Sequence, residues 1–248
     1  MQIISARDYD QLSWQASKLL EAQLVLKPDS VLGLATGSSP LGIYAELVRA
    51  YQSGAVDFSH ARTVNLDEYV GLPKDHPQSY ARFMREHLFD HVNINPGNTH
   101  IPDGMNPDAA AECTRYDGLI RRLGGIDLQL LGLGPNGHIG FNEPEDHFPT
   151  GTHKVTLTEA TIQANKRFFD SEDQVPRFAY TMGVREIMQS RYVVLVVSGE
   201  GKAEIVKEAF FGPVRPQVPA SILQLHRRFT LVADEAALSK VSDMVKKV

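Results

Sequence analysis

Cysteine is almost absent from this chain, because Cys113 is the single one among 248 residues. One cysteine excludes an internal disulfide framework, and without a cysteine cluster no sequence pattern indicates a zinc site. The surrounding residues 110–116 have a helical pattern, which favours a packed, inert thiol over a nucleophile. We therefore predict neither disulfides nor a bound metal ion.

Long apolar runs and an excess of basic charge are also missing. The first eight residues lack the apolar stretch of a signal peptide, and no stretch approaches the roughly 20 residues of a membrane-spanning helix. There are 25 basic and 30 acidic side chains, and the formal net charge is -5. This balance gives no general attraction to nucleic acid or anionic membranes. We expect a cytoplasmic protein that binds neither, and a phosphorylated ligand would need a local cationic pocket.

What the sequence does contain is an alternation of strand-like and helical segments. Strands are predicted at residues 30–35, 62–66, 126–131, 191–197 and 229–232, with a further extended segment at 154–157. Helices are predicted from about residue 41 and at 78–90, 107–123 and 235–245. The residues before the first strand look like one amphipathic helix. Such alternation is typical of a parallel sheet that is covered on both faces.

Length and pattern together predict one domain over residues 1–248. With 42% hydrophobic residues, the chain can bury one large core. We expect an α/β, Rossmann-like fold in which helices cover both faces of an open, mostly parallel sheet. The least regular stretch, residues 145–176, is rich in Pro, Gly, Asp and Thr and predicts a surface lid.

The most informative segment is a glycine-rich turn that follows the strand at 126–131. Residues 132–144 read Gly-Leu-Gly-Pro-Asn-Gly-His-Ile-Gly-Phe-Asn-Glu-Pro. Open α/β sheets bind ligands at the carboxyl ends of their strands, and glycines there allow close backbone approach. His138 can move protons near neutral pH, and Glu143 is near enough in sequence to orient it or balance its charge. The alternative is a tight structural turn in which His138 only satisfies a buried partner.

Two other turns have features of an anion site. Residues 36–40, Thr-Gly-Ser-Ser-Pro, join a strand to a helix, where backbone N–H groups, hydroxyls and a helix N-terminus attract anions. The alternative is a Ser N-cap followed by proline, and the Gly-Lys-Ser/Thr ending of a Walker loop is missing. Lys202 follows the strand at 191–197 in the first turn of a helix, where a cation is unfavourable unless it meets an anion.

Asp67 and Glu68 are adjacent carboxylates at the end of the strand at 62–66. Consecutive residues on extended backbone face opposite ways, so only one of the two can readily point into a cleft. A carboxylate there can abstract a proton from a carbon beside a carbonyl. The alternative is a helix cap or a surface salt bridge.

Several sequence blocks, taken together and in order, resemble the glucosamine-6-phosphate deaminase (isomerase) family nearly from end to end. They are residues 34–40, 65–72 (Asn-Leu-Asp-Glu-Tyr-Val-Gly-Leu), 137–144, 165–169 and the Lys202 turn. The resemblance implies hydrolytic deamination and aldose–ketose isomerisation of glucosamine 6-phosphate, which yield fructose 6-phosphate and ammonia. It implies no metal and no organic cofactor, because a carboxylate, an imidazole and a charge-stabilising pocket suffice.

The same resemblance assigns roles to residues of this chain. Asp67 is implied to move the proton between C2 and C1, and His138 to assist opening of the pyranose ring, oriented by Glu143 and Asn136. Some members have aspartate at the position of Asn136, so Glu143 alone could stabilise a charged imidazole here. The residues implied to bind the phosphate are Thr36, Gly37, Ser38, Ser39, Arg167 and Lys202.

The chain is most similar to the shorter, non-allosteric branch of the family. It ends soon after its last predicted helix, and residues 146–155 lack the basic spacing that larger members use for the activator N-acetylglucosamine 6-phosphate. A monomer or small homo-oligomer is therefore expected. Two alternatives are a 6-phosphogluconolactonase, which would not need Asp67 to shuttle a carbon-bound proton, and a non-catalytic sugar-phosphate sensor of the same fold.

Overall fold

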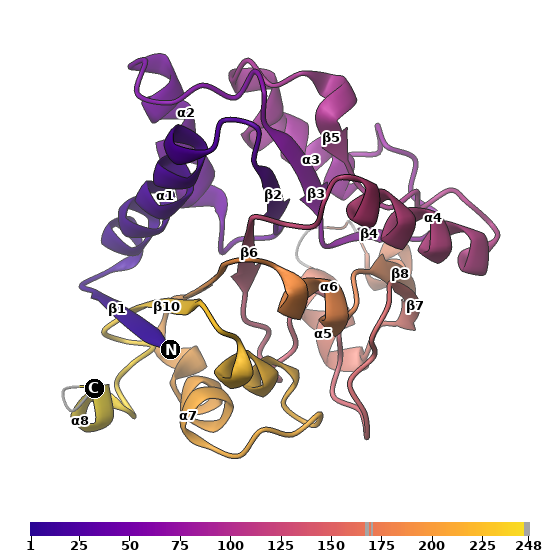
Figure 1. Cartoon of the computed structure of the whole chain (residues 1–248). Helices are drawn as coiled ribbons and strands as arrows, with labels where there is room; N and C mark the ends of the chain where they lie inside the picture. The colour runs from indigo at the N-terminus through magenta and orange to yellow at the C-terminus, as the bar shows by residue number, and fades with distance from the viewer. Residues whose placement is uncertain (167–168, 170, 246–248) are drawn as a thin grey trace.

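A computed structural model describes residues 1–166, 169 and 171–245 of the chain (Figure 1). Its main feature is a seven-stranded sheet in which each strand runs parallel to its neighbours. The strands, in spatial order, are β1 (Gln2–Ala6), β10 (Phe229–Asp234), β9 (Val193–Val197), β6 (Leu128–Gly132), β2 (Val31–Leu34), β3 (Arg62–Asn65) and β5 (Thr99–His100).

Helices cover both faces of this sheet. Those on one face are α1 (Tyr9–Leu26), α2 (Leu41–Gln52) and α3 (Tyr80–His87). Those on the other are α4 (Ala109–Arg122), α6 (Val184–Gln189) and α7 (Ala203–Phe211). The predicted α/β fold, an open parallel sheet between helical layers, is confirmed.

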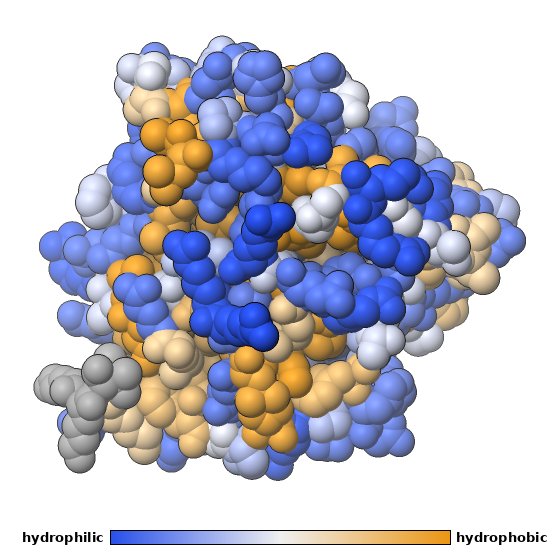
Figure 2. All heavy atoms as spheres, in the orientation of Figure 1, coloured by the Kyte–Doolittle hydropathy of each residue, from blue (hydrophilic) through white to orange (hydrophobic). Residues whose placement is uncertain are grey.

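Strand β9 shows why the sheet needs helices on both sides. Val193 and Leu195 pack into the core beneath α4, α6 and α7, whereas Val194 and Val196 pack into the core beneath α1, α2 and α3. Alternate residues of a strand face opposite ways, so an entirely apolar strand must be covered on both faces of the sheet. Hydrophilic residues nevertheless cover most of the molecular face in Figure 2.

A smaller antiparallel sheet adjoins the main one, to its right in Figure 1. Its strands, in spatial order, are β4 (Asp67–Tyr69), β8 (Phe178–Thr181) and β7 (His153–Thr156). Only Leu66 separates β3 from β4, so the chain leaves the carboxyl end of a central strand and at once joins the second sheet. Tyr69 and Phe141 belong to a third apolar core against this sheet.

Short elements complete the described chain. They are α5 (Glu159–Asn165), α8 (Ser242–Val245) and 3-10 helices at Phe89–His91, Pro96–Asn98, Glu172–Gln174, Glu200–Lys202 and Pro219–Leu225. No helix in the described part of the chain has both the length and the apolar character needed to cross a membrane.

Two predictions near the chain ends are wrong. The residues before the strand at 30–35 are not one helix, because β1 precedes α1 and forms an edge of the sheet by pairing with β10. Its five residues are too few to stand out beside the helical pattern that follows. Residues 235–241 form turns, and only Ser242–Val245 are helical. Their apolar spacing reflects burial of turns against the core, by Ala237, Leu238 and Val241.

The segment at 145–176 has more regular structure than predicted. The extended residues at 154–157 largely coincide with β7, and α5 follows shortly after. Pairing of β7 with β8 supplies the order that the sequence pattern did not indicate. Its action as a lid stays a prediction.

Candidate active site

A cavity of about 730 Å³ opens at the carboxyl ends of the central strands. After β2 the chain continues to β3 and β5 on one side of the sheet, whereas after β6 it continues to β9 and β10 on the other. The loops after β2 and β6 therefore diverge at a topological switch point, which is where open α/β sheets bind ligands. The cavity has a volume that suits a small organic ligand.

The loop after β2 forms one wall of this cavity through Thr36, Gly37, Ser38 and Ser39. Gly37 has a φ of 86°, a left-handed conformation that other residues rarely adopt. The alternative of a Ser N-cap does not apply, because the residue that caps α2 is Pro40, which makes no side-chain hydrogen bond. The four predicted loop residues are thus brought together beside the N-terminus of a helix.

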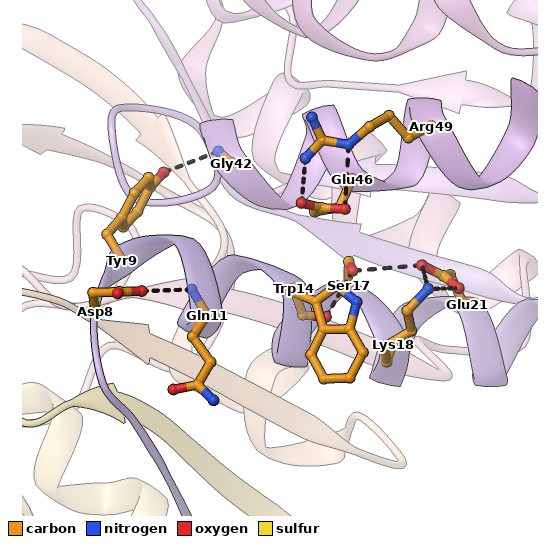
Figure 3. Close-up of polar contacts among 10 residues, drawn as sticks. All are labelled: Asp8, Tyr9, Gln11, Trp14, Ser17, Lys18, Glu21, Gly42, Glu46 and Arg49. Atoms are coloured by element: carbon orange, nitrogen blue, oxygen red, sulfur yellow. Dashed lines mark hydrogen bonds and ion pairs between the residues drawn. The ribbon is translucent and has the colours of Figure 1, made fainter.

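Tyr9, at the start of α1, lines the cavity and contacts this loop, and its bond to Gly42 is drawn in Figure 3. Its hydroxyl lies 3.0 Å from the carbonyl oxygen of Ser38 and 3.1 Å from that of Ser39, and it accepts the backbone N–H of Gly42 at 2.9 Å. The Tyr9 hydroxyl therefore accepts a backbone N–H in the first turn of α2, which is the role that an N-cap side chain normally has. No local sequence signal indicates Tyr9, because its partners are about thirty residues away.

Asp67 and Glu68 face opposite ways, as the strand geometry predicted. Asp67 lines the cavity, whereas the carboxylate of Glu68 accepts the backbone N–H groups of Tyr69, Tyr80 and Ala81, each at 2.9 Å. Burial raises the pKa of Asp67 to about 8, and the charge of Glu68 contributes. Burial also raises the pKa of Glu68 to about 7, although the backbone donors oppose it.

His138 lines the same cavity, and Glu143 and Asn136 lie behind it. The Nδ1 atom of His138 is 3.4 Å from Oε2 of Glu143, and the amide of Asn136 donates to that oxygen at 2.6 Å. The oxygen of Asn136 accepts the backbone N–H of His138 at 3.2 Å. Burial acts to raise the pKa of Glu143, but the hydrogen bonds from His138, Thr161 and Asn136 bring it below its usual range.

Gly134 leaves room for the His138 ring. A Cβ atom at Gly134 would lie 2.2 Å from two ring atoms of His138, closer than any real contact. Gly140 has a φ of 59°, and a Cβ atom there would lie 3.0 Å from the hydroxyl oxygen of Thr181. These glycines let the turn at 132–144 pass close to the His138 ring and to strand β8.

Strand β8 joins the Asp67 segment to the His138 turn. Thr181 pairs with Asp67 across the small sheet, and its hydroxyl accepts the backbone N–H of Phe141 at 3.0 Å. The amide of Asn142 donates to the carbonyl of Met182 at 2.9 Å. Two segments about 70 residues apart are thereby held on one scaffold, and both reach the same cavity.

Lys202 lies at the end of the turn that follows β9, and it lines the cavity. Its Nζ atom donates to the carbonyl oxygen of Leu133 at 2.7 Å, which places the ammonium next to the loop after β6. The remaining predicted phosphate contact, Arg167, falls outside the described residues. The structure thus brings together Asp67, His138 and Lys202 with the 36–39 loop.

Among the cavity-lining residues that were not predicted as site residues are Tyr80, Phe141 and Thr161. Tyr80 and Phe141 form an aromatic wall with a ring-centroid distance of 6.2 Å, and Thr161 donates a hydrogen bond to Glu143. Among the described residues, the one group of carboxylate and imidazole atoms close enough to share a metal ion is exposed and lies outside the cavity lining. It consists of Glu145, Asp146 and His147.

Comparisons with known proteins agree with this geometry. The family model described as glucosamine-6-phosphate isomerases/6-phosphogluconolactonase matches residues 9–232. A glucosamine-6-phosphate deaminase of Halothermothrix orenii is 54% identical over 96% of this chain and 99% of its own length. One of Clostridioides difficile is 50% identical over 98% of this chain and 97% of its own.

Solved structures separate the two branches of the family. A structure described as a monomeric glucosamine-6-phosphate deaminase superposes with a TM-score of 0.95 at 44% identity, over 97% of this chain and 100% of that one. A 6-phosphogluconolactonase from Trypanosoma brucei has a TM-score of 0.75 at 19% identity, over 97% of this chain and 98% of that one, which is likeness of fold alone. The chain belongs to the glucosamine-6-phosphate isomerase/6-phosphogluconolactonase family, and within it to the glucosamine-6-phosphate deaminases.

Proposed function

We propose that this protein converts glucosamine 6-phosphate and water to fructose 6-phosphate and ammonia. The observation that carries the proposal is that a buried carboxylate, Asp67, and an imidazole, His138, face one cavity that also holds an anion-type loop and Lys202. An aldose–ketose isomerisation needs a base beside C2, and ring opening needs a proton donor near the ring oxygen. The lining of the cavity contains one group of each kind, Asp67 and His138.

Each step of the proposed reaction uses a residue of the cavity. His138, backed by Glu143 and Asn136, transfers a proton to the ring oxygen as the pyranose opens. Asp67 removes the proton from C2 and delivers it to C1 while one ammonium proton passes to O1, which leaves a C2 iminium. Water adds to C2, the C–N bond breaks, and ammonia and the C2 ketone result. The amino group of the substrate, when protonated, favours the ionised form of the neighbouring Asp67, whose pKa is raised in the free protein.

The phosphate binds, in this proposal, at the N-terminus of α2. The 36–39 loop offers backbone N–H groups and hydroxyls, and Lys202 and Arg167 supply positive charge. A protein with a net charge of -5 needs such fixed local cations to hold a dianion. Because a sugar phosphate crosses membranes poorly, we further propose that the enzyme is a cytoplasmic hydrolase, active as a monomer or small homo-oligomer without cofactor.

An ammonia-release assay tests the proposal. Glucosamine 6-phosphate is compared with glucosamine and with 6-phosphogluconolactone, and ammonia is expected from the phosphorylated amino sugar alone. Hydrolysis of the lactone without ammonia release would instead assign the lactonase reaction. Binding of glucosamine 6-phosphate with no turnover of any compound would support the sensor.

The variant Asp67→Asn tests the assignment of the base. Its turnover is expected to fall by about 10²–10⁴-fold while substrate binding is kept, because an amide cannot accept the C2 proton. Hydrogen exchange at C1 of fructose 6-phosphate in heavy water gives an independent measurement. Exchange at the wild-type rate would show that another group is the base.

A further inference from the structure

Glu143 is a buried carboxylate whose two oxygens have different tasks. Its side chain is 4% exposed, so the protein itself must satisfy both oxygens. Oε2 accepts the amide of Asn136 at 2.6 Å and lies 3.4 Å from Nδ1 of His138. Oε1 accepts the hydroxyl of Thr161 at 2.5 Å, a short contact of the kind made with an ionised acceptor.

Thr161 is constrained so that its hydroxyl proton points at Glu143. It lies in the first turn of α5, where the N-cap Thr158 accepts its backbone N–H at 3.3 Å. The hydroxyl of Thr158 donates to the hydroxyl oxygen of Thr161 at 3.1 Å, so the Thr161 proton is left for Glu143. The Thr161 residue is 3% exposed and lines the cavity.

We propose that Thr161 is a positioning residue, which holds the Glu143 carboxylate in the orientation that presents Oε2 to His138. The inference rests on the proposed function of His138. The terminal torsion of a glutamate is soft, so a carboxylate anchored at one oxygen alone can rotate in its pocket. With Thr161 on Oε1 and Asn136 on Oε2, the carboxylate plane is held from both sides.

This role couples the 145–176 segment to the chemistry. Helix α5 belongs to that segment, yet it contributes a hydroxyl to the hydrogen bonds behind the imidazole. A shift of α5 away from the cavity breaks the bond to Oε1 and releases the carboxylate. The position of α5 therefore sets the orientation of His138 through Glu143.

Two substitutions at one position separate the hydroxyl from the shape. Thr161→Val keeps the branched side chain without the hydroxyl, and Thr161→Ser keeps the hydroxyl. We expect Val to lower kcat for ammonia release by about 10- to 100-fold, with KM changed less than about threefold. Ser is expected to restore kcat to within about threefold of wild type. Wild-type kcat in the Val variant, or equal losses in both variants, would overturn the inference.

Thr230→Val is the matched control. Thr230 is also buried, and its hydroxyl bonds to that of Tyr192 at 2.8 Å on the central sheet, away from the cavity. It measures the general effect of losing a buried, bonded threonine hydroxyl, and its kcat is expected to stay within about twofold of wild type. An equal fall of kcat in Thr230→Val and Thr161→Val would show a general loss of packing and overturn the inference.

The ring-nitrogen NMR signals of His138 give a readout that does not depend on activity. They are expected to move in Thr161→Val, to return toward wild type in Thr161→Ser and to stay in place in Thr230→Val. Signals unchanged in Thr161→Val contradict the positioning role. If the wild-type protein releases no ammonia but the His138 signals still move in Thr161→Val as expected, the proposed function is refuted. The link between Thr161 and His138 then still stands.

Discussion

At the scale of single residues, one carboxyl group that lines the cavity and one that lies behind His138 have opposite pKa shifts. Asp67 is buried and adjoins another carboxylate, and its pKa is raised to about 8. Glu143 is also buried, but donors surround it and its pKa is lowered. A proton-accepting group with a raised pKa beside an ionised, orienting group is a common arrangement in acid–base catalysis. The difference comes from the neighbours of each side chain, since burial alone would raise both.

The raised pKa of Asp67 predicts a pH dependence of folding stability. Between its usual pKa of 3.8 and about 8, the folded protein retains a proton that the unfolded chain releases, so stability falls as pH rises through this window. Asp67→Asn removes that loss. We expect the unfolding free energy of Asp67→Asn minus that of the wild type to increase between pH 5 and 8. The increase is on the order of 1 kcal/mol per pH unit. Urea unfolding at both pH values measures this, and a gain that does not change with pH would contradict it.

Gly134→Ala is predicted to damage catalysis more than folding. The new methyl group would lie 2.2 Å from the His138 ring, which must turn away. Displacement of a catalytic group by about 1 Å can lower kcat on the order of 10²-fold. The control is Gly118→Ala on α4, where the methyl meets only the end of the Arg122 side chain at 3.4 Å. The kcat and the melting temperature of both variants are measured. Equal kcat values would show that the His138 ring does not need the space left by Gly134.

At the scale of elements, two contacts between distant segments shape the cavity. Strand β8 joins the Asp67 segment to the His138 turn, and the first residue of α1 fastens the loop before α2. Helices α1 and α2 pack closely at Gly42, where a Cβ atom would lie 2.3 Å from the hydroxyl of Ser13. This close approach brings the Tyr9 hydroxyl within reach of the loop.

Tyr9→Phe is therefore predicted to weaken phosphate binding. It removes one hydroxyl that contacts two carbonyl oxygens and accepts one N–H. The ordered conformation of the loop is thereby destabilised by about 1–2 kcal/mol. We expect KM for glucosamine 6-phosphate and the inhibition constant of inorganic phosphate to rise together by about five- to tenfold, with kcat little changed. Tyr51→Phe, near the other end of α2, is the control. If the melting temperature falls while KM and the inhibition constant stay at their wild-type values, Tyr9 contributes to packing alone and the prediction is wrong.

At the scale of the whole molecule, the order of strands places the cavity. The sheet grows outward in both directions from β2 and β6, so the loops after these strands part and leave a crevice between them. Residues 146–155 lie away from its lining, and their one lysine, Lys154, stacks on Phe178 with 4.2 Å between Nζ and the ring centroid. Residues 146–155 themselves therefore contribute no other lysine or arginine for a second phosphate.

We accordingly predict hyperbolic kinetics with glucosamine 6-phosphate. N-acetylglucosamine 6-phosphate should change neither KM nor the shape of the curve, because an effector without differential contacts to two states cannot shift them. A titration of that compound at subsaturating substrate measures this, alongside light scattering to follow the mass of the protein. A Hill coefficient clearly above one that the effector restores to one would contradict the prediction.

The sequence by itself indicated strands β2, β3, β6, β7, β9 and β10 and the order of the motifs at their ends, whereas β4, β5 and β8 were not predicted. Buried strands such as 191–197 are apolar on both faces, and turns such as 132–144 need glycine, so both leave local patterns. The opposite orientation of Asp67 and Glu68 also follows from local geometry. Local patterns did not indicate β1, whose place depends on a partner strand more than 220 residues away.

Only the tertiary structure decided which groups meet. The contacts of Tyr9 with Gly42, of Thr181 with Phe141 and of Thr161 with Glu143 each join segments far apart in the chain. A hydroxyl has no periodic or compositional signature, and its partner is selected by how helices and strands pack. The same holds for the pKa of Asp67, because burial is a property of the assembled core and leaves no mark on the residue type.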